Sequence, residues 1–265
     1  MKNLILNQIY STRKNILLVI ILLLFLDSSQ LVFMLNDAKL NNVTASQLDF
    51  LIRIGGGIQQ NFNLFQYIKW IIVICTLLLL VENINNTNKG LDLMLISRTD
   101  SRFKWWSSKI IALILLNIFY VVLFFGMQKL ISMIFLPSTN IWSSYLKIYY
   151  LKFYNSSLAP KEFQIIILGI LLTGFIAIST LFQTINLIFS SNEKVFIIAV
   201  IVFLISGVLY MNRSVPRVLS PLNYSSTMDI LPNIQCYARS IFLNIILIIV
   251  NVTAGYLVVR KKSIL

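Results

Sequence analysis

The stretch IIALILLNIFYVVLFFGMQKLISMIFL, residues 110–136, contains a single charged residue, Lys129. A helix rises 1.5 Å per residue, so about 20 apolar residues cross the roughly 30 Å hydrocarbon core of a bilayer. This stretch is therefore long enough to span a membrane with some tilt. Five further apolar stretches follow the same pattern, and together they predict six spans at about residues 16–35, 64–81, 110–136, 163–189, 195–211 and 241–259.

The composition of the whole chain favours the same class. The 265 residues are 58% hydrophobic and 12% charged, with a mean hydropathy of +0.83, whereas a soluble domain carries about 25% charged residues. No small-x-small cleavage site follows the first span, so we expect that span to be retained. The chain is predicted to be an all-α polytopic membrane protein with one transmembrane domain over residues 1–265.

The net charge of +13, from 22 Lys and Arg against 9 Asp and Glu, indicates topology rather than a nucleic-acid partner. The cations crowd the ends of apolar stretches, as the positive-inside rule describes, instead of forming a basic stripe on a soluble fold. With six spans, both termini lie on one side. We expect that side to be cytoplasmic, because it carries the larger group of cations: Lys2, Arg13, Lys14, Lys89, Arg98, Arg102, Lys104, Lys109, Lys194, Arg260, Lys261 and Lys262.

The residue counts argue against catalysis by this chain. It has no histidine, which excludes histidine-based acid–base and nucleophile systems. No phosphate-binding glycine loop and no metal-ligand cluster occur. Cys75 and Cys236 fall in an apolar span and a polar loop, so they are expected to be unpaired thiols. We therefore expect no enzyme activity, no bound cofactor and no metal in this chain.

Residues 2–13, KNLILNQIYSTR, place Leu4, Ile5 and Ile9 on one helical face. This pattern predicts a short helix lying in the membrane interface before the first span. The alternative is an inward extension of that span.

The connection between spans two and three carries the most specific pattern. Glu82 ends the second span, a polar run leads to Gly90, and the chain then reads LDLMLISRTDSRFKWWSSKI. Leu91, Met94 and Leu95 share a face at i, i+3 and i+4, which predicts a helix of about two turns. Such a helix either binds a cytoplasmic partner or lies on the bilayer, with Trp105 and Trp106 as interface anchors.

These features resemble the first cytoplasmic loop of the permeases of type 2 ATP-binding cassette exporters. That family has an interfacial N-terminal helix, six spans, cytoplasmic termini, and a coupling helix that docks on a separate ATPase subunit. The resemblance implies that Leu91, Met94, Leu95 and Ile96 dock on the ATPase. It matches the segment entering span three with Ser97, Arg98, Ser101, Arg102, Trp105 and Lys109. Thr99 stands where the family often has proline.

The connection at residues 212–240 contains Pro216, Pro221 and Pro232 and mixes apolar with polar residues. In the family that it resembles, this region dips back into the membrane as short re-entrant helices. Irregular backbone is tolerated at that depth only where protein or water shields it. The alternative is a folded external loop.

Polar residues inside spans are candidates for a functional pathway. Asp27 and Lys69 are candidates for an intramembrane pair, with snorkelling to the interface as the alternative for both and for Lys129. In the fourth span, a polar stripe is formed by Thr173, Thr180, Gln183, Thr184 and Asn186, beside small residues at Gly169 and Ala177. Either helix packing or a translocation path accounts for that stripe.

The function expected from this resemblance is that of an exporter permease subunit in the bacterial cytoplasmic membrane. The bacterial source rests on the Ile, Asn and Lys richness of the chain. The partners would be membrane lipid, an ATPase subunit that holds ATP and Mg²⁺, and a second permease copy or a related permease. The substrate would be amphipathic or hydrophobic: an antimicrobial peptide or bacteriocin, a drug or a lipid-like molecule. A non-transporting scaffold, regulator or immunity protein is the alternative.

Overall fold

In a computed structural model, residues 2–58, 64–85, 101–139, 141–150, 158–189, 192–212, 214–230 and 233–261 are described, and their regular structure is entirely helical. Five helices are long and apolar enough to cross a membrane: α2 (Arg13–Leu40), α4 (Leu64–Asn85), α6 (Arg102–Phe135), α9 (Pro160–Ile188) and α11 (Ile234–Lys261). The predicted all-helical fold is confirmed for the described residues, and these five helices agree with a multi-pass membrane protein. A sixth helix, α10 (Asn192–Met211), has a shorter apolar part, Val195–Met211.

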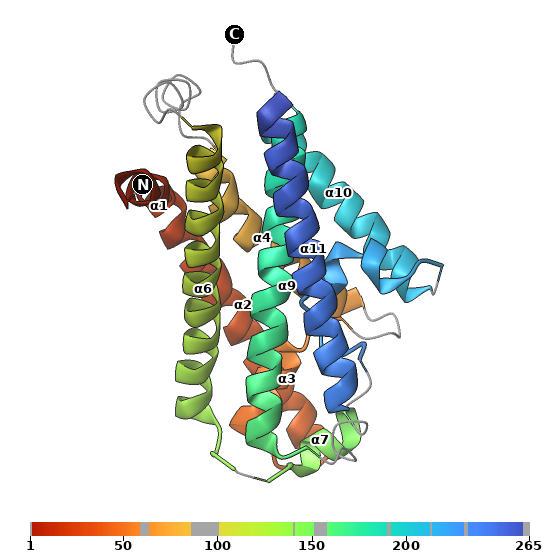
Figure 1. The fold of residues 1–265 in the computed structure, drawn as a ribbon. Coiled ribbons are helices and arrows are strands. Elements are labelled where there is room, and N and C mark those ends of the chain that lie inside the picture. The colour runs from red at the N-terminus through yellow and green to blue at the C-terminus, as the bar shows by residue number, and fades with distance from the viewer. Residues whose placement is uncertain are drawn as a thin grey trace.

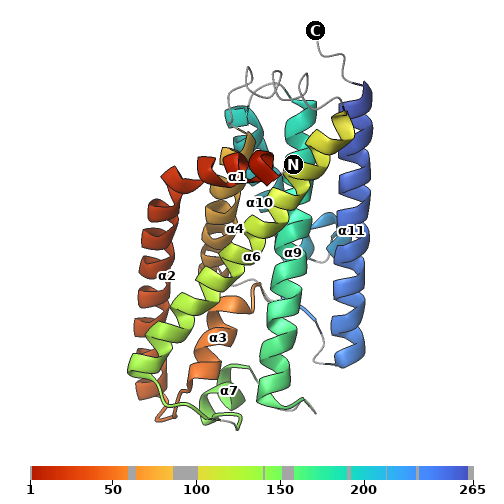
Figure 2. The same cartoon turned by 60° about the vertical axis from the view of Figure 1, so that its left-hand side comes forward.

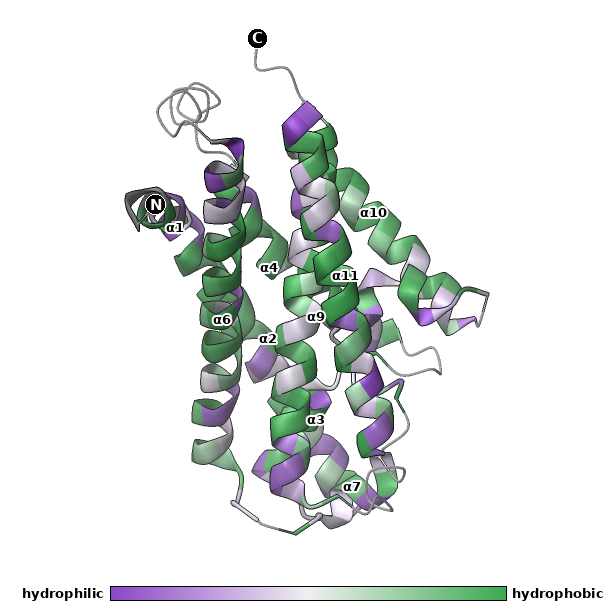
Figure 3. Cartoon of the chain, viewed as in Figure 1, coloured by the Kyte–Doolittle hydropathy of each residue, from purple (hydrophilic) through white to green (hydrophobic). Residues whose placement is uncertain are grey.

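The long helices extend beyond the apolar stretches that predicted them. Helix α6 begins at Arg102 because the Ser101 hydroxyl accepts a hydrogen bond from the Lys104 backbone N–H at 3.4 Å, which caps its first turn. The middle of α6 is hydrophobic, and its hydrophilic residues lie toward both ends (Figure 3). This distribution suits a helix with an apolar middle inside a bilayer and polar ends outside it.

Helix α1 (Lys2–Ser11) and the last turn of α11 lie at one end of the helix bundle, together with the last turn of α4 and the first turn of α6 (Figure 1). We call this the terminal end and the opposite one the distal end. Helix α1 lies across the terminal end and packs against α6 and α4 (Figure 2). The chain turns at Thr12, whose hydroxyl donates to the Ile9 carbonyl at 2.7 Å. The N-terminal helix is therefore separate from α2 and does not extend it inward.

Two short helices lie at the distal end: α3 (Gln47–Gly55) and α7 (Ser144–Tyr149). Sequence analysis predicted neither. Helix α3 begins at a reciprocal cap, in which the Ser46 backbone N–H donates to the Asp49 carboxylate at 2.6 Å. It then runs back into the bundle against α2, α6 and α9, and most of its residues are buried.

Candidate functional site

Residues 86–100, which contain the predicted docking residues Leu91, Met94, Leu95 and Ile96 together with Arg98, lie outside the described residues. Arg102, Trp105 and Lys109 are described, in the first two turns of α6. The ammonium of Lys109 lies 4.5 Å from the centre of the Trp105 ring, a cation–π contact. Trp105 and Trp106 are buried at the terminal end of the bundle, so neither is an exposed interface anchor.

The first turns of α6 are fastened to the last turns of α11. The Arg102 guanidinium donates to the Arg260 carbonyl at 2.6 Å, and the Phe103 and Tyr256 rings meet edge to face with centroids 5.6 Å apart. One turn further along α6, the Trp106 indole N–H donates to a backbone carbonyl of α11, that of Val252, at 3.0 Å. Three successive contacts therefore hold the two helices together where the chain enters α6.

Gly255 allows this close approach of α6 and α11. A Cβ atom at Gly255 would lie 2.3 Å from the Trp106 ring, which is far inside van der Waals contact. The indole therefore occupies the space that any larger residue at position 255 would fill. No sequence pattern predicts that Trp106 packs against Gly255.

A second feature is the segment of residues 217–230, which we call the inserted segment. It contains two 3-10 turns, Arg217–Leu219 and Pro221–Asn223, and every residue from Ser220 to Ile230 is buried. A Cβ atom at Gly174, in the middle of α9, would lie 2.5 Å from the Ser225 backbone. The segment therefore reaches the middle of the bundle and does not fold outside it.

The inserted segment and the end of α3 meet through their backbones. The Thr227 and Met228 backbone N–H groups both donate to the Gly56 carbonyl at 2.9 Å, and the Ser226 hydroxyl accepts from the Ile58 N–H at the same distance. Gly57 between them has φ +81°, a conformation that favours glycine. The irregular backbone in the middle of the bundle is thus satisfied by hydrogen bonds within the chain.

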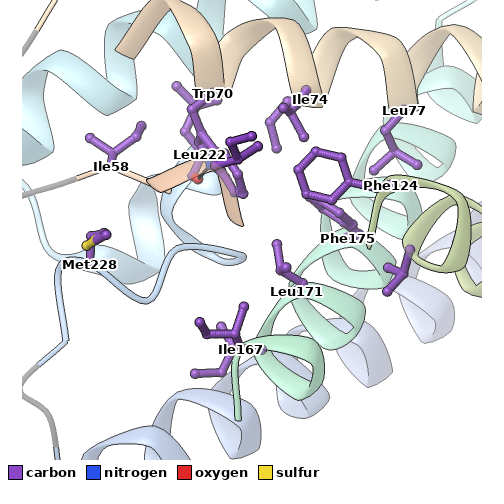
Figure 4. Packing of buried hydrophobic residues seen from close by; sticks show 14 of the residues in the cluster. Ile58, Trp70, Ile74, Leu77, Phe124, Ile167, Leu171, Phe175, Leu222 and Met228 are labelled. Atoms are coloured by element: carbon purple, nitrogen blue, oxygen red, sulfur yellow. Dashed lines mark hydrogen bonds between the residues drawn. The ribbon is translucent and has the colours of Figure 1, made fainter. Parts of the chain in front are cut away.

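Side chains from the long helices satisfy further carbonyls of the inserted segment. The Trp70 indole donates to the Leu222 carbonyl at 2.9 Å, and the Asn244 amide donates to the Tyr224 carbonyl at 2.9 Å. Figure 4 shows Leu222 and Met228 in the same buried apolar cluster as Trp70 and Leu171. The segment is therefore held by polar contacts on its backbone and by apolar packing of its side chains.

One ion pair lies within this region. The Arg217 guanidinium lies 3.4 Å from the Asp229 carboxylate, which also accepts a hydrogen bond from the Tyr210 hydroxyl at 3.0 Å. Burial raises the pKa of Asp229, and the positive charge of Arg217 opposes that rise. Arg217 also donates to the Asn223 and Ser226 carbonyls, so it fixes the fold of the inserted segment from inside.

Asp27 and Lys69 do not form a direct ion pair. The Lys69 ammonium donates to the Arg53 carbonyl in the last turn of α3, whereas neither oxygen of the fully buried Asp27 has a hydrogen-bond partner among the described residues. The two side chains still influence each other electrostatically. Lys69 therefore stabilises the C-terminal end of α3, where helix carbonyls lack partners and the helix dipole is negative.

Other charges hold the distal end of the bundle. Arg53 donates to Asp37 at 2.7 Å and so joins α3 to α2. The Asp49 carboxylate accepts from the Ser143 hydroxyl at 2.6 Å; burial raises its pKa, and this hydrogen bond opposes the rise. Lys129 donates to the Gln47 side chain at 2.7 Å, so it joins α6 to α3 and does not snorkel outward.

The three threonines of the polar stripe of α9 contact α11. The Thr184 hydroxyl donates to the Asn251 carbonyl at 2.9 Å, the Asn251 amide reaches Thr180 at 3.5 Å, and the Asn244 amide donates to Thr173 at 3.2 Å. Helix packing therefore accounts for the three threonines. Gln183 and Asn186 are also buried, and their side-chain carbonyl oxygens have no partner among the described residues.

Cys75 and Cys236 are free thiols, and no group of metal-ligating side chains occurs within the described ranges.

Comparison of the chain with protein-family models, curated proteins and solved structures found no match.

Proposed function

We propose that this chain is the membrane subunit of an ATP-binding cassette exporter in a bacterial cytoplasmic membrane. The observation that carries the proposal is the attachment of α6 to α11 at the terminal end. The connection that resembles a coupling loop enters α6 there, and Arg102, Phe103 and Trp106 fasten the entry point to α11. A displacement of this connection by a cytoplasmic partner would move two long helices together.

Three further features support the same proposal. Helix α1 lies across the terminal end, as an interfacial helix would. Helix α10 has an apolar part from Val195 to Met211. In this proposal it serves as the sixth span, with both termini in the cytoplasm. The inserted segment reaches the level of Gly174, which agrees with the re-entrant region of the family that the chain resembles.

In this proposal the chain hydrolyses no ATP. Leu91, Met94, Leu95 and Ile96 dock on a separate ATPase subunit, which holds ATP and Mg²⁺. A second permease copy or a related permease completes the transporter within the lipid bilayer. The substrate is amphipathic or hydrophobic, either a peptide such as a bacteriocin, a drug or a lipid-like molecule. Export of a bacteriocin would serve peptide secretion or the immunity of the producing cell.

Co-purification with the ATPase encoded beside this chain tests the proposal. Met94→Asp and Leu95→Asp place a charge on the predicted docking face, and each is expected to reduce recovery of the ATPase and ATP-dependent transport by at least about tenfold, because a buried unpaired charge costs several kcal/mol. Leu93→Asp is the matched control, since residue 93 lies off that face.

Retention of the complex and of transport in both charged variants would contradict the docking assignment. Failure of the wild-type chain to bind any ATPase would favour the alternative, a membrane scaffold or immunity protein that transports nothing.

A further inference from the structure

Four uncharged polar side chains gather along one buried interface. Tyr237, Ser240 and Asn244 lie on α11 at i, i+3 and i+7, and Ser225 belongs to the inserted segment. Each is at most 6% exposed. The Tyr237 hydroxyl, the Ser240 hydroxyl, the Asn244 side-chain carbonyl and the Ser225 hydroxyl have no hydrogen-bond partner among the residues that the structure describes. We call these four residues the polar seam.

Contacts at both ends place the seam between α11, α9 and the inserted segment. At the inner end, the Asn244 amide donates to the Tyr224 carbonyl, next to Ser225, and to Thr173 in the middle of α9. At the outer end, the Tyr237 ring lies 6.0 Å from the Phe163 ring, near the start of α9. Seven residues of helix separate Tyr237 from Asn244, a rise of about 10 Å.

The outer end of the seam lies close to the surface. Tyr237 is one turn from Ile234, which is exposed, as are its neighbours Asn233 and Gln235. The seam therefore leads from the exposed start of α11 to the middle of the bundle. A small molecule that entered there would meet a polar side chain at each turn of the helix.

Native proteins leave few buried polar atoms without a partner, because such atoms have lost hydration and gained nothing in return. Elsewhere in this bundle, buried hydroxyls are paired: Ser179 donates to Asn117 at 3.1 Å, and Thr76 and Tyr120 share a hydrogen bond of 2.7 Å. Four unpaired groups along one interface therefore indicate that their partners come from outside the chain.

The chemistry of the seam selects the kind of partner. None of its four residues is charged, and the nearby Asp229 carboxylate already interacts with Arg217 and Tyr210. A charged ligand would lack a counterion here. The Asn244 carbonyl only accepts hydrogen bonds, and the three hydroxyls both accept and donate. The ligand must therefore be uncharged and able to donate hydrogen bonds.

We infer that the polar seam is a hydrated site within the membrane domain that binds water and uncharged hydrogen-bonding groups such as amides and hydroxyls. The site does not depend on an ATPase partner, so it goes beyond the proposed function. If the chain is an exporter, the seam offers a place for the polar groups of an amphipathic substrate.

Cysteine reactivity in lipid nanodiscs tests the site. In a nanodisc the reagent reaches both faces of the membrane, so the measured rate does not depend on the orientation of the chain. In a Cys75→Ser, Cys236→Ser background, Ser240→Cys is treated with a methanethiosulfonate that carries a fixed positive charge. Such a reagent needs water and an ionised thiol, and burial in apolar surroundings suppresses thiol ionisation. We expect modification at least about tenfold faster than at a dry buried position.

Two controls define the dry positions. Ser179→Cys replaces a buried serine that has a partner within the chain, and Phe242→Cys places a thiol on the exposed apolar face of α11. Ser225→Cys repeats the test from the inserted segment if Ser240→Cys is not monodisperse. Reaction of the seam cysteine no faster than Ser179→Cys would overturn the inference, whether or not an ATPase binds the chain.

Discussion

Gly174→Ala is expected to destabilise this protein by about 1–3 kcal/mol, the usual cost of overpacking a well-packed interior. The new Cβ would lie 2.5 Å from the Ser225 N and Cα atoms and 2.6 Å from the Tyr224 carbonyl carbon. These are backbone atoms, so no side-chain rotation relieves the clash. The inserted segment must move away from α9, which lengthens the hydrogen bond from Asn244 to the Tyr224 carbonyl.

Gly126→Ala is the matched control, because no heavy atom lies within 4 Å of a Cβ placed there. Alanine also has a higher helix propensity than glycine, by about 1 kcal/mol. The two substitutions are therefore expected to shift the thermal unfolding midpoint of the purified protein in opposite directions. An unchanged midpoint for Gly174→Ala would show that the inserted segment does not pack on α9 as described.

Residue type and run length alone predict the long helices. An apolar stretch such as residues 163–189 has one stable arrangement in a bilayer, because a helix satisfies its own backbone hydrogen bonds there. This prediction requires no knowledge of the neighbouring helices. The spacing of Thr173, Thr180 and Thr184 likewise placed them on one face, but only the structure shows that α11 covers that face.

The structure differs most from the sequence-based expectation between α2 and α4. Residues 36–63 lie between the first two predicted spans, and the sequence analysis predicts no helix there. Ser46 and Asp49 nevertheless form a helix-start signal, S-x-x-D, followed by Phe50, Leu51 and Ile52. That signal was sufficient to predict α3, although not its position inside the bundle.

The interactions of Lys69 could not be predicted either, because they also depend on the position of α3 inside the bundle. Its acceptor is the Arg53 carbonyl, which is free to accept a hydrogen bond because α3 ends two residues later. The sequence alone indicates only charged side chains as partners, and Asp27 is the one that it predicts. A partner that exists only because a helix ends beside it is a property of the tertiary fold.

Lys69→Met is expected to cost about 1–3 kcal/mol of stability, the usual cost of leaving a buried hydrogen-bonding group without its partner. The change removes the donor to the Arg53 carbonyl and leaves Asp27 without a nearby positive charge from α4. Asp27 is 0% exposed, so its carboxylate gains no compensating hydration. The measurement is the free energy of unfolding in detergent or, where unfolding is irreversible, the midpoint of thermal aggregation.

A double-mutant cycle separates the two causes of that loss. Asp27→Asn removes the ionisable carboxyl group, so in the Lys69→Met background it is expected to recover about 1 kcal/mol, as coupled neighbouring groups do. Lys129→Met is the control for a lysine that donates to an uncharged side chain, Gln47, and is expected to cost only about 1 kcal/mol. If Asp27→Asn recovers nothing, the cost of Lys69→Met lies wholly in the end of α3, and Asp27 contributes no charge that Lys69 must balance.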